Sequence, residues 1–317
     1  MNKAASLLQS PLYITVSLLL VIVLLIPGCG EESSEPPIIF SITAEPDIIP
    51  PGETSTVTIK AGDPDQDDLS YVWTAEDGQI QGSGKSIVWS SPTTEGKYTL
   101  TVTVSDGADS VTQAVGIWVW TPRQGDYYPL EIGNQWIFKD TEGNTINFEI
   151  IDTIDISGVT AYVKQMETTK IENAATYSYM AKNSDLISQH AMGGSNIGGD
   201  TLIFEPQLPI YKLPLVPGSS WEVEFTVWVQ DGYYVGSGTA LYEVASEEDL
   251  TVEAGSFQNV FKVKEDFTWE LIGQEVTHII SYHWVAPNVG VVKFVQEEEV
   301  GGEIITTEAA LQSYSLR

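Results

Sequence analysis

Four aspartates that could bind a metal ion are concentrated in the stretch GDPDQDDL, at residues 62–69. Asp63, Asp65, Asp67 and Asp68 supply the four carboxylates. Ca²⁺ takes about six to eight oxygen ligands, and aspartates on a flexible loop are a usual source of them. The stretch is not an EF-hand, because the glycine and the final glutamate of that motif are missing. Calcium binding is one hypothesis for these residues, and an acidic, solvated turn is the other.

Other metal and catalytic chemistry lacks its usual motifs. His278 and His283 lie five residues apart, which in a strand sends their side chains to opposite faces. The chain has no C-x-x-C, H-x-x-x-H or G-x-S-x-G motif, and the glycine-rich residues 193–200 lack the lysine of a phosphate-binding loop. We therefore expect no transition-metal site and no enzyme, hence no catalytic residues. Acidic pairs for glycoside hydrolysis stay open, because the 44 acidic residues supply many pairs and a sequence contains no distances.

One tryptophan is predicted to face solvent. Residues 221–230, WEVEFTVWVQ, alternate between apolar and polar side chains, which is typical of a strand with one buried face. Trp228 shares the polar face with Glu222 and Glu224, and an exposed tryptophan among polar groups suits recognition of a partner. Trp228 is therefore the candidate binding residue.

A proline-rich stretch precedes that strand. Residues 208–218, LPIYKLPLVPG, contain three prolines, so we expect that they do not form a central strand. They cover an open sheet, form the rim of a pocket or simply cross from one element to the next.

Charge and cysteine content limit the classes of partner. The 317 residues include 14 basic and 44 acidic side chains, a net charge of −30, which opposes binding to nucleic acid and to anionic membrane surfaces. Solubility in a salty environment explains this charge equally well. Cys29 is the only cysteine, so no disulfide can form within the chain, and the length suffices for two domains with hydrophobic cores.

The position of Cys29 indicates a role in targeting. It follows an apolar run from Leu12 to Ile26, which is short for a membrane span of about 20 residues but suits a signal peptide. The residues IPGC, 26–29, resemble the bacterial lipobox. That resemblance implies acylation of Cys29 and removal of residues 1–28, leaving 29–37 as an acidic tether. An uncleaved anchor and an ordinary secretory signal are the alternatives. Gly30 is not an aspartate, which by resemblance to the sorting pattern of lipoproteins favours the outer membrane.

Residues 38–120 are predicted to form a β-sandwich. The segment KYTLTVTVS, 97–105, alternates strictly, and turn sequences separate several such short strands. The stretches AGDPDQDDLSYVWTAEDG and GKYTLTVTVSDGADS resemble the PKD domain, an immunoglobulin-like module of bacterial surfaces. By that resemblance Trp73 is the family's tryptophan and Asp77-Gly78 its turn, although the motif that follows Trp73 is altered.

After a linker at 121–126, residues 127–317 are predicted to form a second all-β domain. Ten or more strands indicate a large antiparallel sheet, either a sandwich or an open barrel. The stretches YYPLEIGNQWIF, VEAGSFQNVFKV and HWVAPNVGVVKF resemble a group of bacterial envelope lipoproteins, from which no activity is carried over. Gly133, Gly255 and Gly290 are expected in turns.

Together these features predict a lipid-anchored protein of the cell envelope, at the outer membrane or cell surface. The PKD-like domain would act as a spacer, and the second domain would recognise a polysaccharide or an envelope protein without catalysis. This hypothesis requires a filled core and an external aromatic patch. The alternative is a carrier of a lipid or other apolar ligand, which requires an internal apolar cavity. A hydrolase with an accessory PKD module is a third option, which rests on fold analogy alone.

Overall fold

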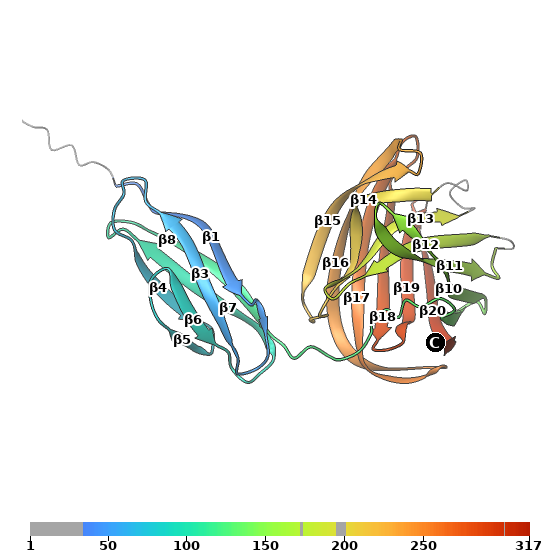
Figure 1. Ribbon diagram of the computed structural model, residues 1–317, viewed down its shortest axis with the longest axis horizontal. Coiled ribbons are helices and arrows are strands. Elements are labelled where there is room, and N and C mark those ends of the chain that lie inside the picture. The colour runs from blue at the N-terminus through green and yellow to red at the C-terminus, as the bar shows by residue number, and fades with distance from the viewer. Residues whose placement is uncertain (1–33, 172–173, 195–200, 301) are drawn as a thin grey trace, which may run out of the picture.

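The two predicted β domains are both present, joined by a short connecting segment (Figure 1). The structure is a computed structural model that describes residues 34–171, 174–194, 201–300 and 302–317. Within these ranges the regular secondary structure consists of strands, which confirms the all-β prediction. Consequently, no helix long and apolar enough to cross a membrane occurs in the described part of the chain.

The N-terminal domain is a sandwich of two four-stranded sheets. One sheet has the order β1 (Ile38–Glu45), β3 (Thr54–Gly62), β6 (Ser86–Ser90) and β5 (Gln79–Gln81). The other has the order β2 (Ile48–Ile49), β8 (Ser110–Val119), β7 (Gly96–Ser105) and β4 (Ser70–Ala75). The sandwich prediction for this part of the chain is therefore confirmed.

The alternation of β7 determines which of its side chains enter the core of the sandwich. Leu100, Val102 and Val104 are fully buried, and Trp89 of the opposite sheet is buried with them. The predicted Asp77-Gly78 turn is present, with Gly78 at φ +83°. A Cβ atom on Gly78 would lie 2.4 Å from the carbonyl oxygen of Ser90, so only glycine fits this turn.

The C-terminal domain is a closed barrel of twelve antiparallel strands in sequence order. Their bounds are β9 (Gln135–Asp140), β10 (Thr145–Ile156), β11 (Val159–Thr168), β12 (Ala175–Lys182), β13 (Leu186–Gly194), β14 (Thr201–Lys212), β15 (Ser220–Val229), β16 (Tyr234–Val252), β17 (Gly255–Leu271), β18 (Thr277–Ala286), β19 (Gly290–Val300) and β20 (Glu303–Ser315).

The domain is a barrel, which was one of the two predicted forms, but it is closed, so the sandwich alternative and the open edge were wrong. The short strand β9 pairs with β10 on one side and with β20 on the other, and this pairing closes the barrel. Closure satisfies the backbone groups that two free edges would leave unpaired, which is the physical reason that barrels of this kind are stable.

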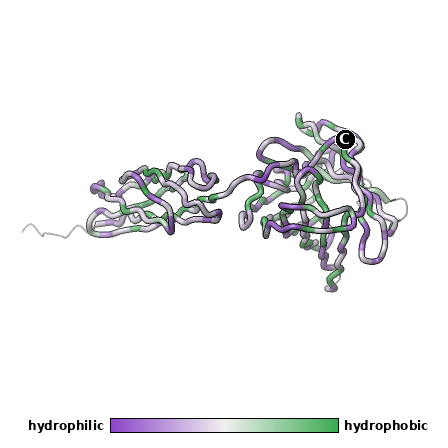
Figure 2. The backbone as a smooth tube through the Cα atoms, turned by 90° about the horizontal axis from the view of Figure 1, so that it is seen from below, coloured by the Kyte–Doolittle hydropathy of each residue, from purple (hydrophilic) through white to green (hydrophobic). Residues whose placement is uncertain are grey.

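Apolar and polar residues alternate along the strands of the barrel (Figure 2), and the buried side chains of these strands are apolar almost throughout. On β15, Trp221, Phe225 and Val227 are buried, whereas Glu222 and Glu224 are exposed, as the alternation predicts. Aromatic rings fill one side of the interior: Phe204 and Phe225 lie 5.5 Å apart, and Phe225 stacks on Phe267 at 5.2 Å.

The proline-rich stretch was not expected to form a central strand, and its first residues, 208–212, belong to strand β14 but pair only with β13. Pairing of β14 with β15 covers Leu202 to Glu205 and stops before Pro206, because a proline cannot donate a ladder hydrogen bond. On its other side β14 pairs with β13 through two register shifts. The prolines therefore interrupt the wall locally without opening the barrel.

The connecting segment holds the two domains together through specific contacts. Arg123 bridges them: its Nη2 lies 3.1 Å from Glu95 Oε2 of the sandwich, and its Nε lies 2.8 Å from Glu247 Oε1 of β16. Its guanidinium also lies over the ring of Trp120, 4.2 Å from the centroid. Trp120 in turn packs against Phe261 of the barrel at 6.4 Å. The predicted linker is thus anchored at both ends.

Candidate ligand cavity inside the barrel

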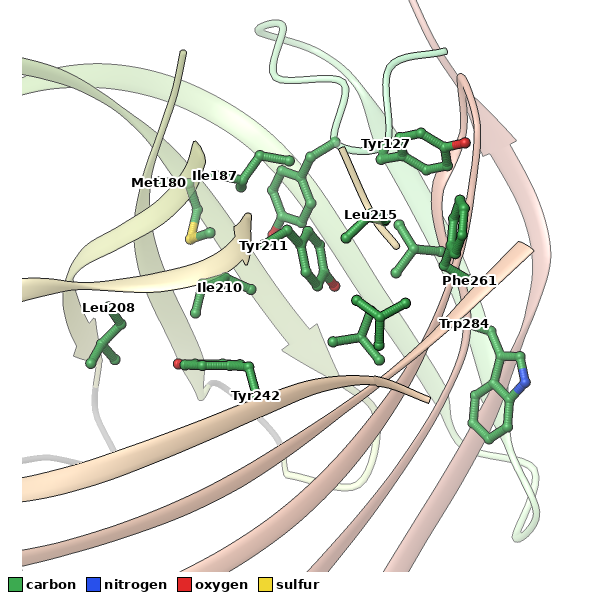
Figure 3. Close-up of a cluster of buried hydrophobic side chains, with 14 of the residues drawn as sticks. Tyr127, Met180, Ile187, Leu208, Ile210, Tyr211, Leu215, Tyr242, Phe261 and Trp284 are labelled. Carbon is green, nitrogen blue, oxygen red and sulfur yellow. The ribbon is translucent and has the colours of Figure 1, made fainter. Parts of the chain in front are cut away.

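A cavity of about 300 Å³, partly open to solvent, lies within the barrel, and the phenylalanines that pack together on β14, β15 and β17 are not part of its lining. Side chains from nine strands line it, together with Tyr128 and Pro129 of the segment that leads into β9. The apolar part of the lining comprises Phe138, Phe148, Met166, Met180, Ile210, Val291 and Phe294. Figure 3 shows Met180 and Ile210 beside Tyr211 in the neighbouring buried cluster.

The segment after the linker closes one end of this cavity. The Tyr128 ring meets the Tyr211 ring edge-on at 6.0 Å. Lys182 Nζ donates to Asp126 Oδ2 at 2.6 Å and to the Tyr128 carbonyl at 3.1 Å. Asn134 Nδ2 donates to the Pro129 carbonyl at 3.0 Å. These bonds fix Tyr128 and Pro129 in place, so the end wall of the cavity is well defined.

Polar side chains enter the cavity at one level of the wall. Glu265 of β17 lies directly opposite Tyr242 on β16 and Ser281 on β18, and Ser281 lies opposite Gln296 on β19. Side chains opposite one another on adjacent strands point to the same face. The pairing of four consecutive strands therefore produces a row of polar groups inside an apolar barrel.

A second polar pair lies on the far wall. Lys164 of β11 is opposite Ser178 of β12, and both line the cavity. Lys164 Nζ donates to the Tyr128 hydroxyl at 2.8 Å and lies over the rings of Tyr128 and Phe148, 5.4 and 5.1 Å from their centroids. The ammonium is thus held by aromatic side chains at the cavity wall.

Burial changes the protonation of the groups that face the cavity. It raises the pKa of Glu265 above its ordinary value and lowers the pKa of His283 to about 4, because removal from bulk water disfavours the charged forms. His283 Nδ1 lies 3.5 Å from the Tyr211 hydroxyl. The Tyr242 hydroxyl is buried next to Glu265, its cross-strand neighbour. Glu265, Ser281 and Gln296 therefore face a molecule inside the barrel.

This arrangement is suited to holding a small molecule. Ligand sites in proteins are mostly apolar, with a few polar groups that determine orientation. Here the aromatic and methionine side chains supply the apolar surface, and the polar row and Lys164 supply the orienting groups.

Of the four aspartates at 63–68, Asp63 binds its own loop and Asp65 binds the preceding segment. Asp63 Oδ1 accepts hydrogen bonds from the backbone N–H groups of Asp65 and Asp67 at 2.9 and 3.2 Å, and Asp65 Oδ2 accepts one from Glu35 at 2.7 Å. No cluster of three or more histidine, cysteine or acidic side chains suitable for a metal ion occurs in the described ranges. Calcium binding by Asp63, Asp65, Asp67 and Asp68 stays a prediction.

Trp228 lies on the same strand face as Thr226, to whose Oγ1 it donates from Nε1 at 2.9 Å. Its ring is half-buried, because it packs edge-on against Tyr234 at 5.6 Å. The adjacent Tyr233 and Tyr234 are 71% and 45% exposed. The exposed aromatic surface at this place thus belongs to the tyrosines more than to Trp228.

The remaining predicted residues fall in separate places. Cys29, the signal peptide at 1–28 and Gly30 lie outside the described residues. The histidines do not meet: His190 contacts Ser188, His278 contacts Asp266, and His283 lies inside the barrel. Gly133, Gly255 and Gly290 all have positive φ, as expected.

The sequence analysis missed the residues of the cavity. Glu265 carried a usable signal, because it lies between Val263 and Phe267 in the apolar register of its strand. An acidic residue in a buried register is costly unless it has a function or a partner. Lys164 and Tyr128 carried no comparable signal, because only the tertiary fold brings them together.

Comparisons with known proteins identify the first domain and also find solved structures of low similarity to this chain. Residues 39–119 match the PKD domain family. No curated protein matches the sequence. Among solved structures, a presumed exported protein with a YmcC-like fold from Bacteroides fragilis is 12% identical, with a TM-score of 0.37. A presumed lipoprotein from Parabacteroides distasonis is 14% identical, with a TM-score of 0.33.

Each of these two alignments covers 61% of this chain and 100% of the other. An auxiliary nutrient binding protein from Bacteroides thetaiotaomicron aligns over 88% of this chain and 98% of its own, at 8% identity and a TM-score of 0.17. Residues 39–119 are thus a PKD domain, an immunoglobulin-like module that precedes the cavity-bearing barrel.

Proposed function

We propose that the protein is a non-catalytic binding protein whose barrel holds a small, largely apolar molecule in its internal cavity. The cavity itself is the observation that supports this proposal. The sequence analysis placed recognition on the outside of a filled domain and kept an internal carrier site as the alternative. The cavity inside the barrel favours the alternative.

The dimensions of the cavity restrict the ligand. A volume of about 300 Å³ is at the lower end of the range for ligand sites. It corresponds to about ten liquid water molecules, which is room for roughly ten to fifteen non-hydrogen atoms. A small metabolite fits this volume, whereas a whole diacyl lipid does not.

The same proposal includes display of the barrel at the cell envelope. The sequence around Cys29 supports lipid attachment there, and the PKD domain would hold the barrel away from the membrane. Several acyl chains are needed for durable anchoring, because one chain binds only marginally. Replacement of Cys29 by serine is expected to abolish incorporation of labelled palmitate, and persistent labelling would contradict lipidation at this residue.

Native mass spectrometry tests the binding proposal directly. The protein used is residues 30–317, which retains every described residue, purified without detergent from a host that exports it to the envelope. We expect an adduct of small-molecule mass. The variant Ser178→Phe fills the cavity and is expected to lose the adduct, whereas Thr153→Phe, on an exposed part of β10, is the matched control and is expected to keep it.

Two results would contradict the proposal. One is a clean mass without adduct that persists after incubation with the probe molecules described in the next subsection. The other is an adduct that survives unchanged in Ser178→Phe, because such a molecule would be bound elsewhere.

A second candidate function is recognition of a polysaccharide or an envelope protein at the exposed aromatic pair Tyr233 and Tyr234, beside Trp228. The large exposed fractions of the two tyrosines favour it. Tyrosine and tryptophan are common at recognition surfaces because they combine an apolar body with a polar group. The test is whether the protein binds envelope polysaccharide in a pull-down assay. If Tyr233→Ala loses this binding, the result supports the second function, and if the variant keeps the binding, the result counts against that function.

A further inference from the structure

Lys164 is the lysine that lines the cavity, and it forms no ion pair within the described ranges. Four other barrel lysines do form ion pairs: Lys170 with Glu142, Lys182 with Asp126, Lys264 with Asp266 and Lys293 with Glu308. The hydrogen bond of Lys164 Nζ goes to the phenol of Tyr128. Glu265 lies near enough to interact with Lys164 through space, but not to pair with it directly. The cavity wall therefore carries an ammonium group without a directly bound carboxylate.

An unpaired charge in such a place is unfavourable. Removing an ammonium from water costs free energy unless an opposite charge and hydrogen bonds replace the lost hydration. The two aromatic rings beside Nζ compensate in part, because a cation over a ring face is attracted to it. Two of the three N–H donors of the ammonium remain without a hydrogen-bond acceptor among the described residues.

None of the other titratable side chains that line the cavity forms an ion pair with Lys164 within the described ranges. They come from four further elements of the fold: Tyr128, Tyr211 on β14, Glu265 on β17 and His283 on β18. Burial raises the pKa of Glu265, an effect that Tyr242 and Lys164 partly oppose, and burial lowers the pKa of His283 to about 4. Burial also raises the pKa of Tyr211 well above the ordinary value for tyrosine. The Lys164 ammonium is therefore left without a directly paired anion at the cavity wall.

We propose that the ligand of the barrel is a small organic anion whose carboxylate or similar group pairs with Lys164 and whose apolar body lies against Phe148, Met166 and Met180. This inference rests on the proposed function and specifies its ligand class. The anion supplies the counter-charge that the wall lacks, and Ser178, directly across from Lys164, supplies an additional hydrogen-bond donor.

A cationic ligand fits the same site less well. It would have to approach Glu265 while remaining in the field of Lys164, and Glu265 lies in a row whose neighbours Ser281 and Gln296 are neutral. A fully apolar ligand would give the Lys164 ammonium neither a counter-charge nor a hydrogen-bond acceptor. The observations thus favour one negative charge and an apolar remainder.

Matched pairs of probe molecules test this inference in the unaltered protein. The pairs are decanoate with decan-1-ol and indole-3-acetate with indole-3-ethanol, with affinities measured by titration calorimetry on residues 30–317. We expect the carboxylate of at least one pair to bind about tenfold or more tightly than its alcohol, since a hydrogen bond to a charged group has this effect.

Three variants test whether Lys164 causes the preference for the carboxylate over the alcohol. Lys164→Met is expected to reduce the affinity for the carboxylate to that for the alcohol, and Lys164→Arg is expected to keep most of the preference. Lys262→Met is the control, because Lys262 also lies over two aromatic rings, at 4.6 and 4.8 Å from the centroids of Tyr282 and Trp284, but does not line the cavity. The probe comparison in the unaltered chain decides the matter if a variant does not fold.

The outcomes separate this inference from the proposed function. Equal affinities within both pairs, absence of carboxylate binding, or a preference that survives in Lys164→Met would overturn the anionic ligand. The proposed function would still stand in either of two cases. An alcohol probe binds the parent protein but not Ser178→Phe, or the native adduct is present in the parent protein and lost in Ser178→Phe. Absence of every probe and of the native adduct would overturn both.

Discussion

The PKD sandwich and the barrel enclose their interiors in different ways, although both are made of alternating antiparallel strands. In the sandwich, two sheets about 10 Å apart bury side chains from both faces around Trp89, which is fully inaccessible to solvent. In the barrel, one sheet of twelve strands curves until β9 meets β20. The diameter of a barrel grows with the number of strands, and about eight strands already give an interior that side chains only just fill.

This difference explains where a site can form. The aromatic side chains of β14, β15 and β17 fill part of the wider interior, and the rest remains as a cavity of about 300 Å³. Polar groups such as Glu265 are tolerated there because they face the cavity instead of a packed core. A sandwich core of the same composition has no space in which such groups could meet a ligand.

The largest expected effect is the loss of packing in the sandwich. Trp89→Ala removes a fully buried ring and its hydrogen bond from Nε1 to the Asp77 carbonyl. We expect the PKD domain to lose about 3–5 kcal/mol of unfolding free energy, measured by urea denaturation of residues 30–317. Ligand binding by the barrel is expected to stay unchanged.

Phe40→Ala serves as the control for this variant, because Phe40 is 68% exposed and its loss is expected to change stability by less than about 0.5 kcal/mol. If Trp89→Ala also abolished binding in the barrel, the two interiors would not be independent.

The second effect concerns pH and should appear in the barrel. The pKa of His283 is lowered to about 4, below the ordinary value of 6.5, because burial disfavours its charged form. As pH falls from 6.5 to 4, the unfolded chain binds a proton that the folded barrel does not, so the barrel loses up to about 3 kcal/mol of stability. This stability is fully present above pH 6.5.

His283→Gln is expected to remove this part of the pH dependence, measured as denaturant midpoints between pH 7 and 4. The PKD domain contains no histidine and provides an internal reference within the same chain. An identical pH slope in the variant and the parent would contradict the burial of His283 at the cavity.

The smallest effect is expected at the junction. Arg123→Gln breaks its pairs with Glu95 and Glu247, which are partly exposed and therefore contribute about 1 kcal/mol together. We expect the two domains to unfold at more separate temperatures in calorimetry. The unfolding free energy of each hydrophobic core is expected to change little. Lys170→Gln, whose pair with Glu142 is exposed and lies within the barrel, is the control. Unchanged coupling in Arg123→Gln would show that the apolar contacts of Ile48, Trp118 and Trp120 with the barrel join the domains without the ion pairs.

Short-range features of this protein were predictable because they depend on neighbouring residues. The alternation of β7 and β15 identified their buried faces, and the Asp77-Gly78 turn was found from its residue types. The prolines of residues 208–218 predicted that this stretch does not form a central strand, and β14 has separated from β15 there, but its pairing with β13 could not be read from the sequence.

The sequence by itself determined the all-β class, the two domains, the position of the PKD module and the strongly acidic surface, since composition and period-two alternation are local properties. Only the tertiary structure decided that the barrel closes, because β9 and β20 are separated by most of the domain. It also decided which polar side chains share the cavity. Lys164, Glu265 and His283 come from distant strands, and they meet because the register of each strand against the next directs them to the same interior.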